Sequence, residues 1–148
     1  MRARELAVDF PSVRTDSPAL EAARLLAQRD LPGLIVVDDR GRPSTILPGT
    51  DVLKMAVPQY CQADPALARV VDEAAADIFI HQLGNRTVAE VLPERLRDLP
   101  VVDGDATALE IAALMARSRS PLVAVVDDRG VLIGAVTLDG LLDRVLAS

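Results

Sequence analysis

An internal repeat constrains this chain more than any other feature. The hexapeptide VVDDRG occupies residues 36–41 and returns at residues 125–130, an offset of 89. When residues 16–53 are laid over residues 105–142 at this offset, 15 of the 38 positions are identical without a gap. Such a repeat predicts two copies of one supersecondary unit, each too small to bury a core alone. We therefore expect the copies to pack together as one module with pseudo-twofold symmetry.

Composition and charge exclude several classes of protein. Half of the 148 residues are apolar, yet no apolar run approaches the roughly 18 residues of a membrane span. The net charge of −6 argues against a nucleic-acid or anionic-membrane partner, and two Phe, one Tyr and no Trp provide no base-stacking platform.

The N-terminal residues and the cysteine content both bear on the cellular compartment. The N-terminus turns acidic at Glu5 and Asp9 before any apolar stretch, so it lacks the layout of a secretory signal. Cys61 is the single cysteine and cannot form an internal disulfide. These features predict a cytoplasmic protein without membrane insertion, and the richness in Ala, Arg and Val is typical of actinobacteria.

Each copy shows the same order of predicted elements, namely strand, helix, strand, strand and helix. In the first copy these are expected at residues 10–13, 18–29, 34–37, 44–47 and 52–56, with Asp16 or Ser17 capping the first helix. In the second copy they are expected at residues 100–102, 106–117, 122–126, 131–136 and 139–146. Residues 3–8 are expected to be a short lead-in.

The repeated Asp-Asp-Arg-Gly is a hairpin turn by composition. Gly41 and Gly130 can adopt the positive φ that such turns require. Each carboxylate pair could also contribute to a Mg²⁺ site, but the absence of a third oxygen ligand nearby in sequence favours a solvated turn.

Residues 57–83 have no counterpart in the other copy. Asp64-Pro65 is typical of a helix start, and an apolar stripe from Leu67 to Phe79 predicts one amphipathic connecting helix that ends near Gly84. We expect this stripe, which includes Val71, to pack on the module or on a twin subunit. The predicted division is residues 1–60 for the first copy, 61–84 for the linker helix and 85–148 for the second copy.

Four stretches of the second copy resemble a known family. These are TVAEVL at 87–92, the helix start at 105–115, SPLV at 120–123 and above all GAVTLDGLL at 134–142, and they resemble a CBS repeat, the unit named after cystathionine β-synthase. Two such repeats in tandem resemble a Bateman module. The resemblance implies an α+β fold of two β-α-β-β-α repeats plus a connecting helix, in a stand-alone module.

The resemblance also implies a function. Such modules bind AMP, ADP, ATP or S-adenosylmethionine as regulatory ligands in clefts between the repeats, and they act on an attached or separate enzyme or transporter. They commonly form flat homodimers, and the apolar helices at 51–57 and 139–147 need cover. No resident cofactor is expected. The family signature is Gly, two apolar residues, Thr or Ser, any two residues, and Asp. It places a hydroxyl that can bind a phosphate beside a helix N-terminus, and a carboxylate that can bind a ribose.

Each copy holds half of that signature. The second copy has Thr137, but Gly140 stands at the carboxylate position and Asp139 comes one residue early. The first copy has Asp51, but Pro48 replaces the hydroxyl and has no N–H to donate. Ligand contact and simple helix capping are both open for Thr137 and Asp139. For Asp51 the alternative to ligand contact is a favourable interaction with the helix dipole.

Three further residues complete the candidate site. Arg119, Pro121 and Leu122 border or enter the strand that lines the cleft in this family, although a solvated helix end is the alternative for Arg119. His81 is the only histidine, so no His-based metal site is available in one chain. The sequence contains no catalytic constellation, so we expect a non-enzyme. The alternative function is a structural or dimerisation module that has lost ligand binding.

Overall fold

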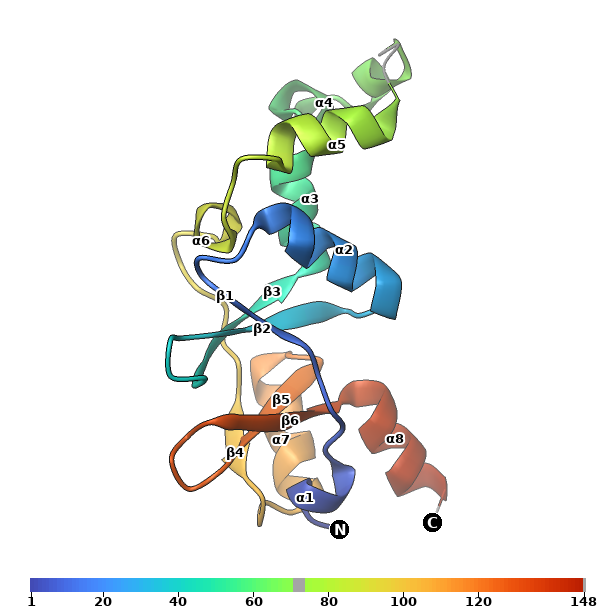
Figure 1. Ribbon diagram of the computed structural model, residues 1–148. Helices are drawn as coiled ribbons and strands as arrows, with labels where there is room; N and C mark the ends of the chain where they lie inside the picture. The colour runs from blue at the N-terminus through green and yellow to red at the C-terminus, as the bar shows by residue number, and fades with distance from the viewer. Residues whose placement is uncertain (71–73, 148) are drawn as a thin grey trace. The chain divides into compact units, whose positions relative to one another are not determined.

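The computed structural model, which describes residues 1–70 and 74–147, contains two three-stranded sheets (Figure 1). The first sheet has the order β1-β2-β3, made of Ser12–Arg14, Gly33–Val37 and Pro43–Pro48. The second has the order β4-β5-β6, made of Val101–Asp103, Leu122–Val126 and Leu132–Thr137. In the second sheet β4 is parallel to β5, and β5 is antiparallel to β6. The α+β prediction is confirmed.

The offset of 89 residues recurs in the structure. The helices α2 (Ala19–Arg29) and α7 (Ala108–Ser118) begin 89 residues apart, as do α3 (Gly49–Ala56) and α8 (Leu138–Ala147). The residues that follow α2 and α7, Asp30 and Arg119, both adopt the left-handed conformation, with φ of 50° and 57°. Sequence similarity therefore extends to unusual backbone geometry, which confirms the predicted repeat.

In each hairpin turn, main-chain N–H groups donate hydrogen bonds to the side chain of the first aspartate of the turn. Gly41 and Gly130 have φ of +80° and +81°, as predicted. Asp38 Oδ1 accepts hydrogen bonds from the main-chain N–H groups of Arg40 and Arg42, and these bonds, that of Arg42 first, lower the pKa of Asp38 below its ordinary value. Asp127 accepts the equivalent pair. Among the described residues, no three His, Cys, Asp or Glu side chains gather as a metal site would require.

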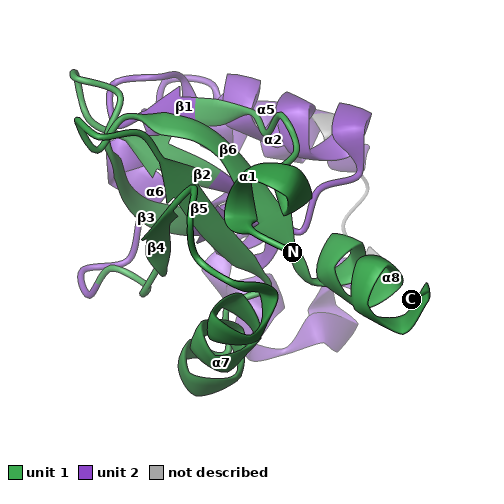
Figure 2. Cartoon of the chain, turned by 90° about the horizontal axis from the view of Figure 1, so that it is seen from below, with its two compact units in different colours: residues 1–12, 35–46, 96–148 green, residues 13–34, 47–95 purple. Residues whose placement is uncertain are grey.

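The chain divides into two compact units that cut across the two sequence copies (Figure 2). Unit 1 consists of residues 1–12, 35–46 and 96–148, and unit 2 of residues 13–34 and 47–95. The core of unit 1 lies between its sheet and α1, α7 and α8, and includes Leu6, Ile111, Val123, Val136 and Leu141.

The N-terminal segment, expected only as a lead-in, is a helix bound to the second copy. Helix α1 (Ala3–Leu6) lies beside α7 and β4. The Ala3 N–H donates to Ala106 O (2.7 Å), and the Ala108 N–H donates to Met1 O (3.1 Å). Beyond the helix, Val8 and Ala135 exchange two main-chain hydrogen bonds of 2.9 and 3.0 Å. Residues 1–8 therefore belong to unit 1.

The opening of the second copy makes the same bonds with the first copy. Helix α6 (Val88–Val91) donates from Val88 N to Ser17 O (2.8 Å), and Ala19 N donates to Arg86 O (2.9 Å). The helices α1 and α6 are 85 residues apart rather than 89, so the gapless offset misses their equivalence. Each copy thus lends its opening segment to the other copy's unit.

This exchange explains why the predicted cap of the first helix is wrong. The helix N-cap is Pro18, without a side-chain bond, and the N–H of Ala19 is satisfied by Arg86 O. Ser17 Oγ accepts from Arg14 N instead, and Asp16 pairs with Arg14 (3.2 Å). In the second copy Thr107 does cap α7, because its hydroxyl accepts from Glu110 N (3.2 Å).

The segment between the copies contains separate helical pieces. These are α4 (Gln59–Ala63), the 3₁₀ helix η1 (Pro65–Val70) and α5 (Ala75–Leu83). One continuous helix is wrong because Ala74 has an extended main chain, with φ −62° and ψ 138°. Val71 lies outside the described residues, and the division at residues 60 and 84 stays a prediction. No helix in the described ranges is long and apolar enough to cross a membrane.

Candidate functional site

The site is built where β6 passes into α8, the junction that carries half of the signature. Thr137 is the last residue of β6 and is half-buried. Its Oγ1 accepts a hydrogen bond from the Gly140 N–H (3.0 Å). The N–H of Leu138, the first residue of α8, donates to Pro121 O (2.9 Å). The first turn of α8 is therefore tied to the loop that precedes β5.

That loop has a fixed conformation. Arg119 reverses the chain after α7 with its positive φ of 57°. Ser120 is buried, and its hydroxyl donates to Leu122 O (2.7 Å) and accepts from Leu122 N (3.2 Å). Pro121 adds a rigid φ. These bonds set the distance between the end of α7 and the start of α8.

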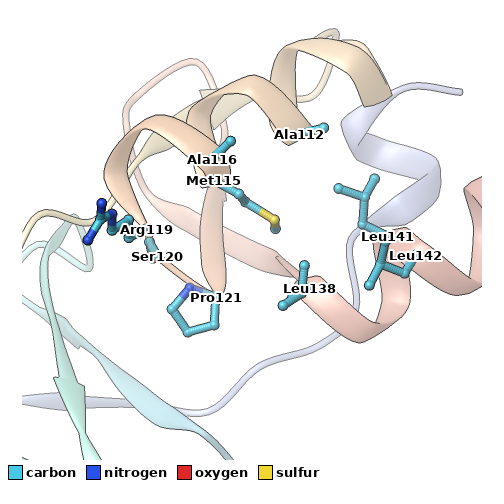
Figure 3. Close-up of a pocket in the computed structure, with 9 residues that line it drawn as sticks. All are labelled: Ala112, Met115, Ala116, Arg119, Ser120, Pro121, Leu138, Leu141 and Leu142. Carbon is cyan, nitrogen blue, oxygen red and sulfur yellow. The ribbon is translucent and has the colours of Figure 1, made fainter.

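A pocket of about 500 Å³ opens between these two helix ends (Figure 3). Its lining is apolar except at one end, and consists of Ala112, Met115, Ala116, Arg119, Ser120, Pro121, Leu138, Leu141 and Leu142. Figure 3 shows Arg119 at the end opposite Leu141 and Leu142, with its guanidinium extending away from them. A flat apolar group would fit among the leucines and Met115, and Arg119 is the one charged side chain in the lining.

The predicted site residues of the second copy lie around this pocket in different ways. Arg119 and Pro121 line it, whereas Leu122 is fully buried in β5 and contributes no lining. Asp139 is exposed in the first turn of α8. The Thr137 hydroxyl is engaged by its own helix through Gly140. Whether these residues touch a ligand stays a prediction.

The equivalent junction in the first copy belongs to unit 2. Pro48 ends β3 and is the N-cap of α3, and the Gly49 N–H donates to Pro32 O at 3.4 Å, the counterpart of the Leu138 to Pro121 bond. Asp51 lies in the first turn of α3 and is only 2% exposed. The junction therefore keeps its backbone geometry although its signature residues differ.

Sequence reasoning missed most of the pocket lining. Helical spacing alone does not distinguish Met115, Leu138 and Leu141 from residues of ordinary apolar helix faces. The available signal was that residues 112, 115 and 116 share one face of α7, and that the loop after this helix, residues 119–121, aligns with residues 30–32 in the internal repeat.

Comparison with known proteins places this architecture. A family model described as the CBS domain matches residues 3–57 and 88–147, more than half of the chain. The chain belongs to the CBS domain family. The two matches correspond to the two sequence copies, so the protein contains a CBS pair. A search of curated proteins finds no match.

Solved structures of CBS proteins share the fold. A CBS domain-containing protein of unknown function from the actinobacterium Kribbella flavida is 50% identical, with 99% of each chain covered and a TM-score of 0.91. CBSX2 in complex with AMP is 17% identical, covering 99% of this chain and 96% of that one, with a TM-score of 0.68. A CBS protein of unknown function from Bacillus anthracis is 13% identical, covering 100% and 94%, with a TM-score of 0.73.

Proposed function

We propose that this CBS pair is a regulatory module that binds an adenine-containing ligand in the pocket between α7 and α8 and modulates a separate partner protein, an enzyme or a transporter. The pocket beside the Thr137 junction carries the proposal, because it offers an apolar slot at the strand-to-helix junction of the family signature. AMP, ADP, ATP and S-adenosylmethionine are the candidate ligands. The proposal assigns no catalysis to the module.

The dimensions and chemistry of the pocket support this ligand class. About 500 Å³ falls within the ~300–1,000 Å³ typical of small-molecule sites. A purine ring is flat and largely apolar on its faces, which suits Met115 and Leu138, while a guanidinium such as that of Arg119 pairs well with phosphate oxygens. The AMP complex of CBSX2 provides a precedent for the ligand class in this fold.

A thermal-shift panel tests the proposal. The purified protein is heated with AMP, ADP, ATP, S-adenosylmethionine and cyclic dinucleotides, each at millimolar concentration. A ligand present at 100 times its dissociation constant should add about 2.7 kcal/mol to the free energy of unfolding, because it binds only the folded state. The absence of a shift with every compound would remove the proposal.

The alternative function is a structural module without a ligand, and one observation favours it. Gly140 allows its own N–H to reach the Thr137 hydroxyl, whereas a side chain there would place its Cβ 2.9 Å from that hydroxyl oxygen. The Thr137 hydroxyl oxygen thus accepts a hydrogen bond within α8, as the oxygen of a helix cap does, and its O–H is still a donor. Nucleotide released from natively purified protein, identified by mass spectrometry, would contradict this alternative.

We further propose that two copies associate through the apolar side of α8. Leu142 and Leu146 are 45% and 77% exposed, and burying a leucine contributes about 1.5–3 kcal/mol. We expect the double change L142E and L146E to weaken self-association at least about a hundredfold. Light scattering at micromolar concentration should then report a monomer, while I133E, at a similarly exposed residue on β6, stays dimeric. A wild-type monomer would contradict this proposal.

A further inference from the structure

A second pocket lies in unit 2, at the C-terminal end of α3. It has a volume of about 440 Å³ and is formed where the end of α3, the start of α4 and the end of α5 meet. Its lining consists of Lys54, Met55, Val57, Pro58, Gln59, Gln62, Gln82 and Arg86. Five of these eight residues lie in the segment 57–83, which has no counterpart in the other sequence copy.

The charge of this pocket is opposite to that of the protein. The chain carries 22 acidic and 16 basic residues, yet the lining contains two cations, three amides and no carboxylate. Neither Lys54 nor Arg86 forms a salt bridge with a described carboxylate. The position equivalent to Lys54 in the second copy is Asp143, so the repeat does not reproduce this charge.

The cations and amides stand on a fixed frame. Arg86 Nε donates to Gln82 O (2.9 Å), which orients the guanidinium at the end of α5 and leaves its two terminal NH₂ groups for another partner. Gln62 Nε2 donates to Lys54 O and Val57 O, both at 2.8 Å. This amide satisfies the last carbonyls of α3 and holds α4 against that helix.

We propose that this pocket binds a small molecule through an oxyanion, either a phosphate ester or a carboxylate. A guanidinium donates two parallel N–H bonds to either group, and the Lys54 ammonium adds a point charge. The side-chain amides of Gln59 and Gln82 can donate to and accept from hydroxyl groups on the same molecule. The pocket is separate from the adenine site, since the two share no residue.

Binding of simple oxyanion probes tests this inference in the full-length chain. Inorganic phosphate and pyrophosphate represent phosphate esters, and citrate represents carboxylates. We expect shifts in ¹H–¹⁵N spectra centred on Gln62, Gln82 and Arg86, with a dissociation constant near ~1 mM or below, so that about 10 mM nearly saturates the site. The probe with the tighter binding identifies the group, and added salt should weaken both.

Charge-removing variants locate the binding. We expect K54Q and R86Q each to weaken the tighter probe at least about tenfold. R24Q, a change at an exposed arginine on α2 of the same unit, should leave binding unchanged. Lys54 is exposed, so K54Q keeps the fold even if R86Q loosens the end of α5. No shifts with any probe at about 10 mM, or full binding by K54Q, would overturn the inference. Neither result would bear on the proposed adenine site. That site is tested separately by the variant A116W, which fills the pocket of unit 1.

Discussion

Replacing Gly134 with alanine should lower the free energy of unfolding by about 1–3 kcal/mol, the usual cost of forcing an extra group into a packed site. Gly134 is buried in β6, and a Cβ there would lie 2.8 Å from the main-chain oxygen of Val8. That oxygen cannot move alone, because Val8 is bonded to Ala135 in both directions. The added methyl group must push residues 1–8 away from β6.

The first copy shows what a side chain needs at this position. Thr45 is the residue equivalent to Gly134, and its hydroxyl donates to Arg97 O (2.7 Å). A side chain is tolerated there because the neighbouring segment leaves room and accepts a hydrogen bond. Alanine at position 134 has neither the room nor the hydroxyl.

Urea unfolding of G134A beside G104A measures this effect. A Cβ on Gly104 would lie 3.4 Å from Arg4 Nε, the end of a flexible side chain, so that variant should stay within about 0.5 kcal/mol of wild type. Equal stability of G134A and wild type would show that residues 1–8 do not contribute to the folded unit. Equal losses in both variants would point to a general intolerance of alanine.

Filling the apolar pocket should abolish the stabilisation by an adenine ligand. Ala116 is exposed on α7 and lines the pocket, so a tryptophan there can occupy the space without entering the core. We expect A116W to lose essentially all of the ~2.7 kcal/mol that a ligand at 100 times its dissociation constant provides. The unliganded melting temperature should change little.

The control is the same substitution on the same helix. Ala113 is also exposed but does not line the pocket, so A113W should keep the full ligand-induced shift. Thermal melts of both variants with the strongest ligand of the panel provide the comparison. If A116W keeps the shift, the ligand binds elsewhere, and the junction at Pro48 and Asp51 becomes the site to test.

Local structure followed the sequence closely wherever neighbouring residues determine it. Gly41 and Gly130 have the positive φ that an Asp-Asp-Arg-Gly turn requires, and the strands and main helices lie within a few residues of their expected ranges. The prediction that Asp16 or Ser17 caps the first helix is wrong because the N–H of Ala19 donates to a distant main-chain oxygen, that of Arg86. The prediction of one long linker helix is wrong because an apolar stripe does not reveal an extended residue such as Ala74 that interrupts a helix.

The candidate site was predictable only in outline. Arg119 and Pro121 could be found from the family resemblance, because they enter the strand beside the signature. Met115, Leu138 and Leu142 could not be separated from ordinary apolar helix faces, since a pocket depends on the distance between two helices. The hydrogen bond from the Gly140 N–H to the Thr137 hydroxyl oxygen could not be predicted either, because a helix cap and a ligand contact use the same residue.

By itself, the sequence determined the repeat, its elements and its turns, since these depend on hydrogen bonds and side-chain periodicity within a few residues. Only the tertiary structure decided that residues 1–8 join the second copy and residues 86–91 the first. These segments are held through main-chain N–H and C=O groups, which every residue except proline provides in full. Leu6 and Val88 are also buried, but an apolar side chain does not specify which core it enters, so the sequence of these segments does not reveal their partner.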